Sequence, residues 1–245
     1  MLEKIKWPED LKNLTNPELI KLASQMRQAL ITRANIVGWH FWPNLGMVEA
    51  TIALHKVFNS PVDKFVFDVS HQSYPHKMLT WRMEAYTNPE KYRSVSGYTY
   101  PKESEHDQFF VWHTSTSISL ACGLAKARDL KWDKENIIAI IWDGSLSGWM
   151  ALEWLNNAEE LNSNLIIILN DNDMSIAENH GWMYKNLKEL RDTKWTSQNN
   201  LFKSFWLDYY FIEDWHNFDE LIETFQKVKD SNKAVVVHMC TVKSK

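Results

Sequence analysis

Glycine is scarce in this chain, and tryptophan is unusually common. An ordinary sequence is about 7% glycine, so a chain of this length is expected to carry roughly 17 glycines. This chain of 245 residues has seven glycines and thirteen tryptophans. The glycine deficit and the tryptophan excess are therefore of similar size, and the two residue types together come close to the glycine count expected alone.

Three further features are missing, and each excludes a class of protein. The chain has only two cysteines, Cys122 and Cys240, so it has no disulfide framework, and the cytoplasm is the expected compartment. No apolar run reaches about 18 residues, so no transmembrane helix is expected, and residues 1–13 lack the apolar core of a secretory signal. The net charge of −4 lacks the basic excess of a nucleic-acid-binding domain.

What is present is the composition of a globular domain, with 44% hydrophobic and 24% charged residues. The continuous apolar runs 137–142 and 165–170 are typical of parallel strands buried on both faces. Further strands are predicted at 64–69, 209–212 and 234–239. Helices are predicted between the strands at 16–30, 45–58, 115–130, 147–161 and 218–229. This alternation predicts an α/β fold, in which a mainly parallel sheet carries helices on both faces.

Polar residues follow the two buried strands, at the edge where ligands bind in such sheets. Asp143, Gly144 and Ser145 come after the first strand, and Asn172 comes after the second. Because a helix joins the two strands, Asp143 and Asn172 are expected side by side at neighbouring carboxyl ends. A carboxylate and an amide oxygen suit Mg²⁺, and backbone N–H groups at the start of a helix favour a diphosphate. The residues therefore predict a metal-plus-diphosphate site.

Each of these residues also has an ordinary structural explanation. An Asp-Gly pair after a strand is usually a turn. Asp143 is therefore a candidate metal ligand only because Asn172 follows it at a suitable spacing. His71 and His76 are spaced like a pair of transition-metal ligands, but no third ligand is evident nearby in the sequence. Cys122 has no activating base near it in the sequence, so it is expected in the core.

The spacing of Asp143 and Asn172 resembles the thiamine-diphosphate motif of the transketolase superfamily, written GDG with an asparagine further along the chain. Trp142 stands in place of its first glycine. Longer segments resemble one branch of that superfamily, the 1-deoxy-D-xylulose-5-phosphate synthase family. These segments are HFWPNLGMVEATIALHKVF (40–58), FDVSHQSYPHKMLTWR (67–82), VWHTSTSISLACGLA (111–125) and ILNDNDMSIAENHG (168–181). The resemblance covers the amino-terminal domain of that family only, so residues 1–245 are expected to form one diphosphate-binding domain.

The resemblance implies a transferase that condenses pyruvate with glyceraldehyde 3-phosphate, with loss of CO₂. It implies thiamine diphosphate and Mg²⁺ as cofactors and a role in isoprenoid and thiamine biosynthesis. It also implies a cytoplasmic homodimer, with neither nucleic acid nor membrane as a partner. Two alternatives stay open: the amino-terminal subunit of a split transketolase that acts on sugar phosphates, and a non-catalytic module if the tryptophans are literal.

The same resemblance assigns roles to individual residues. Asp143 and Asn172 are expected to bind Mg²⁺ together with the backbone carbonyl of Met174. His40 and His71 are the catalytic candidates, and His40 is expected to face the reacting carbons and shuttle protons. The residues expected to line the cofactor are His71, Trp112, His113, Thr114, Gly144, Ser145 and Asn172.

The family continues into further domains that have no match in these 245 residues. One of those domains carries the glutamate that protonates the cofactor and drives formation of its reactive carbanion. The chain is therefore expected to be a fragment, or one subunit of a split enzyme, and to be inactive without its missing domains or a partner subunit.

Tryptophan stands at many positions where the family has glycine. The family has glycine at Trp39, Trp81, Trp112, Trp142, Trp149, Trp206 and Trp215, and commonly at Trp42, Trp132, Trp154 and Trp182. Only Trp7 and Trp195 are ambiguous. Glycine in a phosphate loop permits positive φ and close backbone approach, whereas an indole there overpacks the site. We therefore hypothesise that the gene reads UGA as glycine; the alternative is a pseudoenzyme whose cofactor site is filled by indoles.

Overall fold

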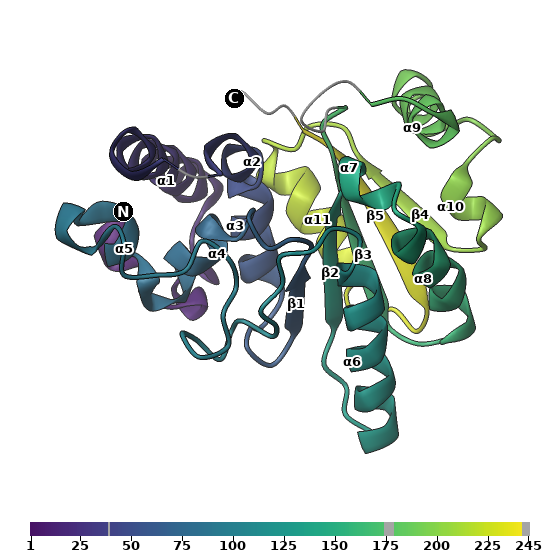
Figure 1. Cartoon of the computed structure of the whole chain (residues 1–245), viewed down its shortest axis with the longest axis horizontal. Helices are drawn as coiled ribbons and strands as arrows, with labels where there is room; N and C mark the ends of the chain where they lie inside the picture. The colour runs from purple at the N-terminus through teal and green to yellow at the C-terminus, as the bar shows by residue number, and fades with distance from the viewer. Residues whose placement is uncertain (39, 174–178, 242–245) are drawn as a thin grey trace.

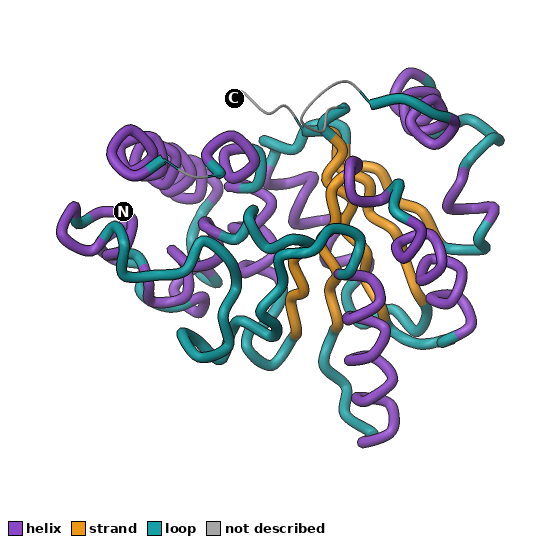
Figure 2. The backbone as a smooth tube through the Cα atoms, in the orientation of Figure 1, coloured by secondary structure: helices purple, strands orange, loops and turns teal. Residues whose placement is uncertain are grey.

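The computed structural model describes residues 1–38, 40–173 and 179–241, and a five-stranded parallel sheet forms its centre. The strands lie in the order β1-β2-β3-β5-β4. Their bounds are β1 (Lys64–Phe67), β2 (Ile137–Trp142), β3 (Leu165–Asp171), β4 (Asp208–Ile212) and β5 (Ala234–Cys240). Helices cover both faces of the sheet (Figures 1 and 2). The predicted α/β class is confirmed.

The helices form two groups, one on each face of the sheet (Figure 1). One group consists of α1 (Asn16–Val37), α3 (Val48–Val57) and α11 (Phe218–Val228), and the other of α6 (Ser117–Lys131), α8 (Trp149–Glu160) and α9 (Trp182–Asp192). The short helices are α2 (Phe41–Leu45), α4 (Tyr74–Lys77), α5 (Glu84–Thr87), α7 (Asp143–Leu146) and α10 (Leu201–Ser204). Single helical turns cover Leu2–Lys4, Pro8–Leu11, Met78–Arg82 and Pro89–Lys91. No helix in the described ranges is long and apolar enough to cross a membrane.

The apolar strands separate two hydrophobic cores. In β2, Ile138 and Ile140 pack into the core shared with α1, α3 and α11. The alternate residues Ile137, Ala139 and Ile141 pack into the core shared with α6, α8 and α9. This alternation follows from the two-residue repeat of a strand. Since both faces are covered, every residue of the strand interior is apolar, which is why the run 137–142 lacks polar positions.

The amino-terminal helix begins where the sequence indicates. Thr15 caps α1, and the Glu18 carboxylate accepts hydrogen bonds from the Thr15 backbone N–H and hydroxyl at 2.8 and 2.7 Å. Pro17 lies in the first turn, where a missing N–H costs nothing. The predicted apolar stripe is buried, and it consists of Leu19, Leu22, Ala23, Met26 and Leu30. The helix is therefore held both by its cap and by its buried face.

Two elements are shorter in the structure than the sequence predicts. The strand predicted at 64–69 stops at Phe67, because Val69 and Ser70 have φ angles of 56° and 62° and turn the chain out of the sheet. The helix predicted at 45–58 is α3, which begins later, at Val48, because Gly46 and Met47 separate it from α2. The short helices between residues 74 and 87 and α10 were not predicted, because they are too short for an apolar repeat. Helix α9 was also not predicted, although Met183, Leu187 and Leu190 recur at helical spacing.

Candidate active site

The carboxyl ends of β2 and β3 lie side by side. These strands pair in parallel, and Trp142 lies opposite Asn170 in the register. Asp143 begins α7 directly after β2 and is fully buried, while Asn172 directly follows β3 and is half-buried. The two predicted metal ligands therefore follow the same edge of adjacent strands. The third predicted ligand, Met174, lies outside the described residues.

Asp143 has a partner that the sequence alone did not indicate. The Asn179 side-chain amide donates a hydrogen bond of 2.9 Å to Asp143 Oδ2. Asn179 belongs to the segment that follows β3, so this contact ties that segment to the start of α7. Gly144 and Ser145, the predicted diphosphate contacts, continue α7 and are half-buried and buried.

The two catalytic candidates lie next to each other. The rings of His40 and His71 are 5.3 Å apart in an edge-on arrangement, and the Tyr98 ring lies 5.4 Å from His40. The Tyr74 hydroxyl is 3.5 Å from His40 Nδ1. Burial lowers the pKa of His40 below its usual value, so the imidazole is neutral at neutral pH. A neutral ring is able to accept a proton, as a shuttle requires.

Asn44 fixes the relative placement of these histidines. Its side-chain amide nitrogen donates hydrogen bonds of 2.7 Å to the backbone carbonyls of both His40 and His71. Its side-chain oxygen accepts a hydrogen bond of 2.9 Å from the Tyr74 N–H. Asn44 is fully buried, and it was not predicted as a site residue. The one available signal is a polar side chain in an otherwise apolar stretch leading into α3.

Asp68 fixes the predicted cofactor-lining segment in the same way. Its carboxylate accepts hydrogen bonds of 2.9 to 3.0 Å from the backbone N–H groups of Ser115, Thr116 and Ser117. These groups include the start of α6, where N–H groups lack helical partners. Burial raises the pKa of Asp68 despite these bonds. From the sequence, Asp68 is predicted only as part of the strand at 64–69. Its role in holding residues 115–117 depends on contacts across 47 to 49 residues.

The segment held by Asp68 also contacts the loop after β2. Ser115 Oγ donates a hydrogen bond of 2.7 Å to the Ser145 carbonyl. A Cβ added at Gly148 would lie 2.0 Å from Ser115 Oγ, so only glycine permits this approach. The predicted cofactor contacts His113, Thr114 and Trp112 precede Ser115 and are exposed, with Trp112 at 61%.

Trp142, which directly precedes the predicted metal ligand Asp143, does not suit the expected cofactor. Its indole centroid lies 5.6 Å from the ring of His71, and its buried Nε1 has no acceptor among the described residues. The oxygen donors of Asp143 and Asn172 suit Mg²⁺ and a diphosphate. The indole, however, directly precedes the predicted metal ligand Asp143 and takes up space beside His71. With tryptophan at 142, the residues present do not fit thiamine diphosphate.

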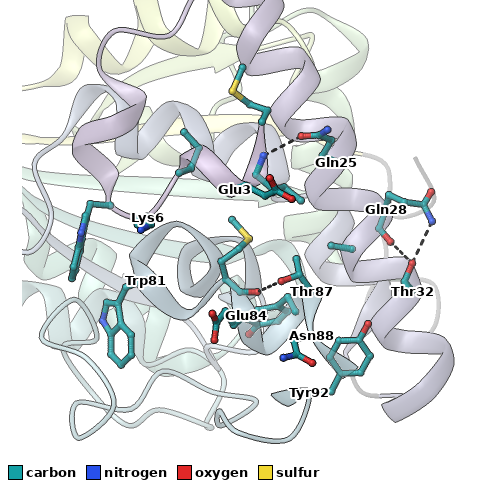
Figure 3. A pocket seen from close by; sticks show the side chains of 17 residues that line it. Glu3, Lys6, Gln25, Gln28, Thr32, Trp81, Glu84, Thr87, Asn88 and Tyr92 are labelled. Atoms are coloured by element: carbon teal, nitrogen blue, oxygen red, sulfur yellow. Dashed lines mark hydrogen bonds between the residues drawn. The ribbon is translucent and has the colours of Figure 1, made fainter. Parts of the chain in front are cut away.

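A cavity of about 1050 Å³ lies away from this edge. It is bounded by the amino-terminal segment, α1 and the region of α5, and Figure 3 shows Trp81 at one end of it and Tyr92 at the other. None of the predicted site residues lines it. A smaller cavity of about 480 Å³ includes Asn172 and His216 in its lining, at the carboxyl ends of β3, β4 and β5.

A second group of metal-ligand residue types proves to be a hydrogen-bonded network. One potential ligand atom from each of Asp171, His238 and Cys240 lies within 4.8 Å of the others. His238 uses both ring nitrogens, at 2.8 Å from Asp171 Oδ2 and 2.7 Å from the Tyr209 hydroxyl. Asp171 also pairs with Arg191, and burial raises the pKa of the Cys240 thiol to about 12. The group therefore holds the end of β3 in place and leaves no ready ligand for a metal.

Comparison with known proteins adds independent information. A family model described as 1-deoxy-D-xylulose-5-phosphate synthase matches residues 2–201. The "1-deoxy-D-xylulose-5-phosphate synthase 1" of Geobacter metallireducens is 40% identical over 281 aligned positions, covering 100% of this chain and 45% of that protein. The 1-deoxy-D-xylulose-5-phosphate synthase of Desulfitobacterium hafniense is 49% identical over 191 residues, covering 78% of this chain and 30% of the relative. This chain thus spans less than half the length of these relatives.

Solved structures show the same fold. A transketolase from Campylobacter jejuni superposes with a TM-score of 0.74 at 17% identity, covering 93% of this chain and 38% of that one. A transketolase variant from Pichia stipitis gives a TM-score of 0.68 at 16% identity, covering 91% and 36%. At these identities the likeness concerns the fold, and it agrees with the parallel sheet described above.

Proposed function

The chain belongs to the 1-deoxy-D-xylulose-5-phosphate synthase family, and from this premise we propose that it is the diphosphate-binding domain of a thiamine-diphosphate-dependent transferase. The reaction we propose is the condensation of pyruvate with glyceraldehyde 3-phosphate, with loss of CO₂, for isoprenoid and thiamine biosynthesis. Because the chain spans less than half of its relatives, this activity belongs to a longer protein or to a complex with a partner subunit.

One observation supports this proposal above the others. The metal-binding residue types and the histidine pair meet at one edge of the sheet, because Trp142, which precedes Asp143, touches His71, and His71 lies against His40. A reaction on a diphosphate-bearing cofactor needs both groups next to each other: an anchor for the charged end and proton-transfer groups near the reacting end.

The site residues keep their proposed roles. We propose Asp143, Asn172 and the Met174 carbonyl as Mg²⁺ ligands, and His40 and His71 as the proton-transfer groups. The cofactor contacts that we propose are the backbone at 112–114, His71, Gly144, Ser145 and Asn172. All of these roles require more space at position 142 than an indole leaves. A homodimer in the cytoplasm completes the proposal, by analogy with the family.

The test is an assay of the complete protein, purified from the source organism with whatever domains or subunits accompany this chain. We expect pyruvate-dependent release of CO₂ that requires glyceraldehyde 3-phosphate, thiamine diphosphate and Mg²⁺. Ketol transfer between sugar phosphates would instead support a split transketolase. Failure of the native protein to bind thiamine diphosphate would refute both enzymes and leave a non-catalytic module.

A further inference from the structure

The indole of Trp142 occupies a site whose other residues suit a diphosphate and a metal, and this disagreement has an explanation. We infer that glycine is the native residue at Trp142 and at the other tryptophans encoded by UGA, because the source organism decodes UGA as glycine and the printed sequence reads it as tryptophan. For positions 112 and 142 the inference rests on the proposed function. For Trp81, Trp132, Trp195 and Trp206 it rests on backbone geometry and exposure, which are independent of any cofactor. Trp39 lies outside the described residues, and Trp154 and Trp215 are not exposed.

Four tryptophans have a backbone conformation that bulky residues rarely adopt. The φ angle is 62° at Trp81, Trp132 and Trp206, and 59° at Trp195. Eleven non-glycine residues in the described ranges have positive φ, and tryptophan supplies four of them. A left-handed backbone brings Cβ too close to the following carbonyl oxygen, and glycine alone avoids this clash. Tryptophan is thus concentrated in a conformation that favours glycine.

Trp132 shows how closely the local structure matches a glycine. It ends α6 with φ 62° and ψ 21°, and its N–H points to the carbonyls of Arg128 and Asp129. The next residue, Asp133, donates its N–H to the Arg128 carbonyl at 3.2 Å. This left-handed ending, in which two successive N–H groups satisfy the last carbonyls, is the ending for which helices use glycine. Nothing in it calls for a large side chain, and the indole is 84% exposed.

The exposure of the tryptophans separates them from the other aromatic residues. Nine of the twelve tryptophans in the described ranges are exposed: Trp7, Trp42, Trp81, Trp112, Trp132, Trp149, Trp182, Trp195 and Trp206. Phenylalanine serves as an internal control, since Phe110 is the one exposed residue among eleven. A large apolar side chain normally packs in the interior, as phenylalanine does here. Tryptophan in the described ranges is therefore found mainly at the surface, whereas phenylalanine is found mainly in the interior.

The rival explanation, a pseudoenzyme whose site is filled by indoles, predicts tryptophans at the site. Trp132 lies at the far end of α6 from the segment that Asp68 holds, separated from it by roughly 22 Å of helix. Trp206 follows α10, is 80% exposed, and donates its N–H to the Lys203 carbonyl in a turn. Neither position has any contact with the site, so blocking a cofactor does not explain them.

Glycine at 142 also resolves the disagreement within the site. It removes an indole whose buried nitrogen lacks an acceptor in the described ranges, and it opens space beside His71. Glycine at 112 removes an exposed side chain from the segment next to Ser115 and leaves its backbone open to a ligand. The edge marked by Asp143 and Asn172 is then accessible to the diphosphate-bearing cofactor that those residues suit.

The first test is the codon at each tryptophan position. We expect UGA at 81, 132, 142 and 206, together with glycine-accepting tRNA that carries a UCA anticodon in the same genome. UGG codons at these positions would overturn the inference.

The second test is peptide mass spectrometry of the protein isolated from its source organism. We expect peptides that span positions 112, 132, 142 and 206 to carry the residue mass of glycine, and tryptophan at these positions would overturn the inference. Both tests are independent of activity. Glycine-containing protein that fails to bind thiamine diphosphate would therefore refute the proposed function while leaving the inference intact.

Discussion

Two sides of the candidate site are built in opposite ways. On the β1 side, formed by α2 and the chain that follows β1, buried polar side chains hold the backbone: Asn44 binds two histidine carbonyls, and Asp68 binds three successive N–H groups. On the side formed by the end of β2, the indole of Trp142 lies against His71 with its nitrogen buried. The first side is held by satisfied hydrogen bonds, whereas the second holds a buried indole nitrogen that has no acceptor among the described residues.

The difference shows which part of the site is ready for a ligand. A site is preorganised when buried polar groups are satisfied by one another and fix the geometry of the reacting groups. On the β1 side, the side chains of Asn44 and Asp68 fix the backbone in this way. The β2 side meets this condition only when position 142 lacks a large side chain, so the two sides agree if glycine is native there.

The largest expected effect is a gain of cofactor binding from glycine on the β2 side. In the complete protein expressed with literal tryptophans, the paired change Trp112→Gly and Trp142→Gly should raise the affinity for thiamine diphosphate with Mg²⁺ about thirtyfold or more, since an indole that overlaps the bound cofactor costs about 1–3 kcal/mol at each site. Calorimetric titration measures this gain. The matched control is Trp182→Gly, an exposed position at the start of α9, which should leave affinity unchanged; an equal gain there would remove the distinction between the two sides.

The next effect concerns Asp143, the proposed metal ligand on the β2 side. In the glycine-containing protein, Asp143→Asn should reduce Mg²⁺-dependent cofactor affinity by more than the roughly 10–100-fold loss that follows when a residue merely supports a ligand. The exposed Asp173 provides the control, as Asp173→Asn. Titration of cofactor at fixed and at varied Mg²⁺ distinguishes lost metal binding from lost cofactor contacts. Wild-type affinity in Asp143→Asn would exclude this carboxylate as a ligand.

A pH effect of about 2 kcal/mol is expected from the β1 side, since solvent screening reduces the full effect of the pKa shift. His76 bonds to His55 at 2.9 Å and to Asp107 at 3.1 Å, and His106 bonds to Ser60. Burial lowers the pKa of His106 from 6.5 to about 4 and lowers the pKa values of the other two histidines.

The sign follows from proton uptake. Between pH 6.5 and about 4 the unfolded chain binds more protons than the folded chain does, so the stability is fully present above pH 6.5 and is lost as the pH falls through this window. Urea unfolding at pH 7.5, 6 and 5 measures the loss. His106→Gln should flatten its slope, and His180→Gln, at an exposed residue, should not. A stability independent of pH in this range would show that the cluster is not buried as described.

An effect of about 1–3 kcal/mol is expected for Asn44→Asp, because it removes two donated hydrogen bonds and faces two carbonyls with a carboxyl group. Asn186 is a matched control: it is also buried, donates to the Asn199 carbonyl at 2.8 Å, and accepts from the Leu201 N–H at 3.1 Å. Both Asp variants should lose similar stability in urea unfolding. Only Asn44→Asp should shift the imidazole NMR signals of His40 and His71; unmoved signals would mean that Asn44 supports the fold alone.

The sequence predicted the β2 side better than the β1 side. Asp143 and Asn172 each follow an apolar run, so the parallel-sheet rule places them at one edge, and the strand pairing agrees. Asn44 and Asp68 act through contacts across 27 to 49 residues, and no local sequence pattern predicts such contacts. The early end of β1 likewise depends on positive φ at Val69 and Ser70, and neither residue type ordinarily adopts a left-handed backbone.

The tryptophans differ from Asn44 and Asp68, because the sequence composition alone suggests that glycine is native at these positions. The backbone geometry at Trp132 allows a local test of that inference. At the end of α6, Trp132 has φ 62°, whereas the preceding Lys131 is still helical. Trp132→Gly should therefore stabilise the chain by about 1 kcal/mol, since it relieves a left-handed L-residue. Lys131→Gly, one position earlier and also exposed, should destabilise it by about 1 kcal/mol, since glycine weakens a helix. Urea unfolding measures both. Opposite signs one residue apart cannot come from the loss of a large or charged surface side chain in general, whereas equal signs would mean that the α6 ending does not require glycine.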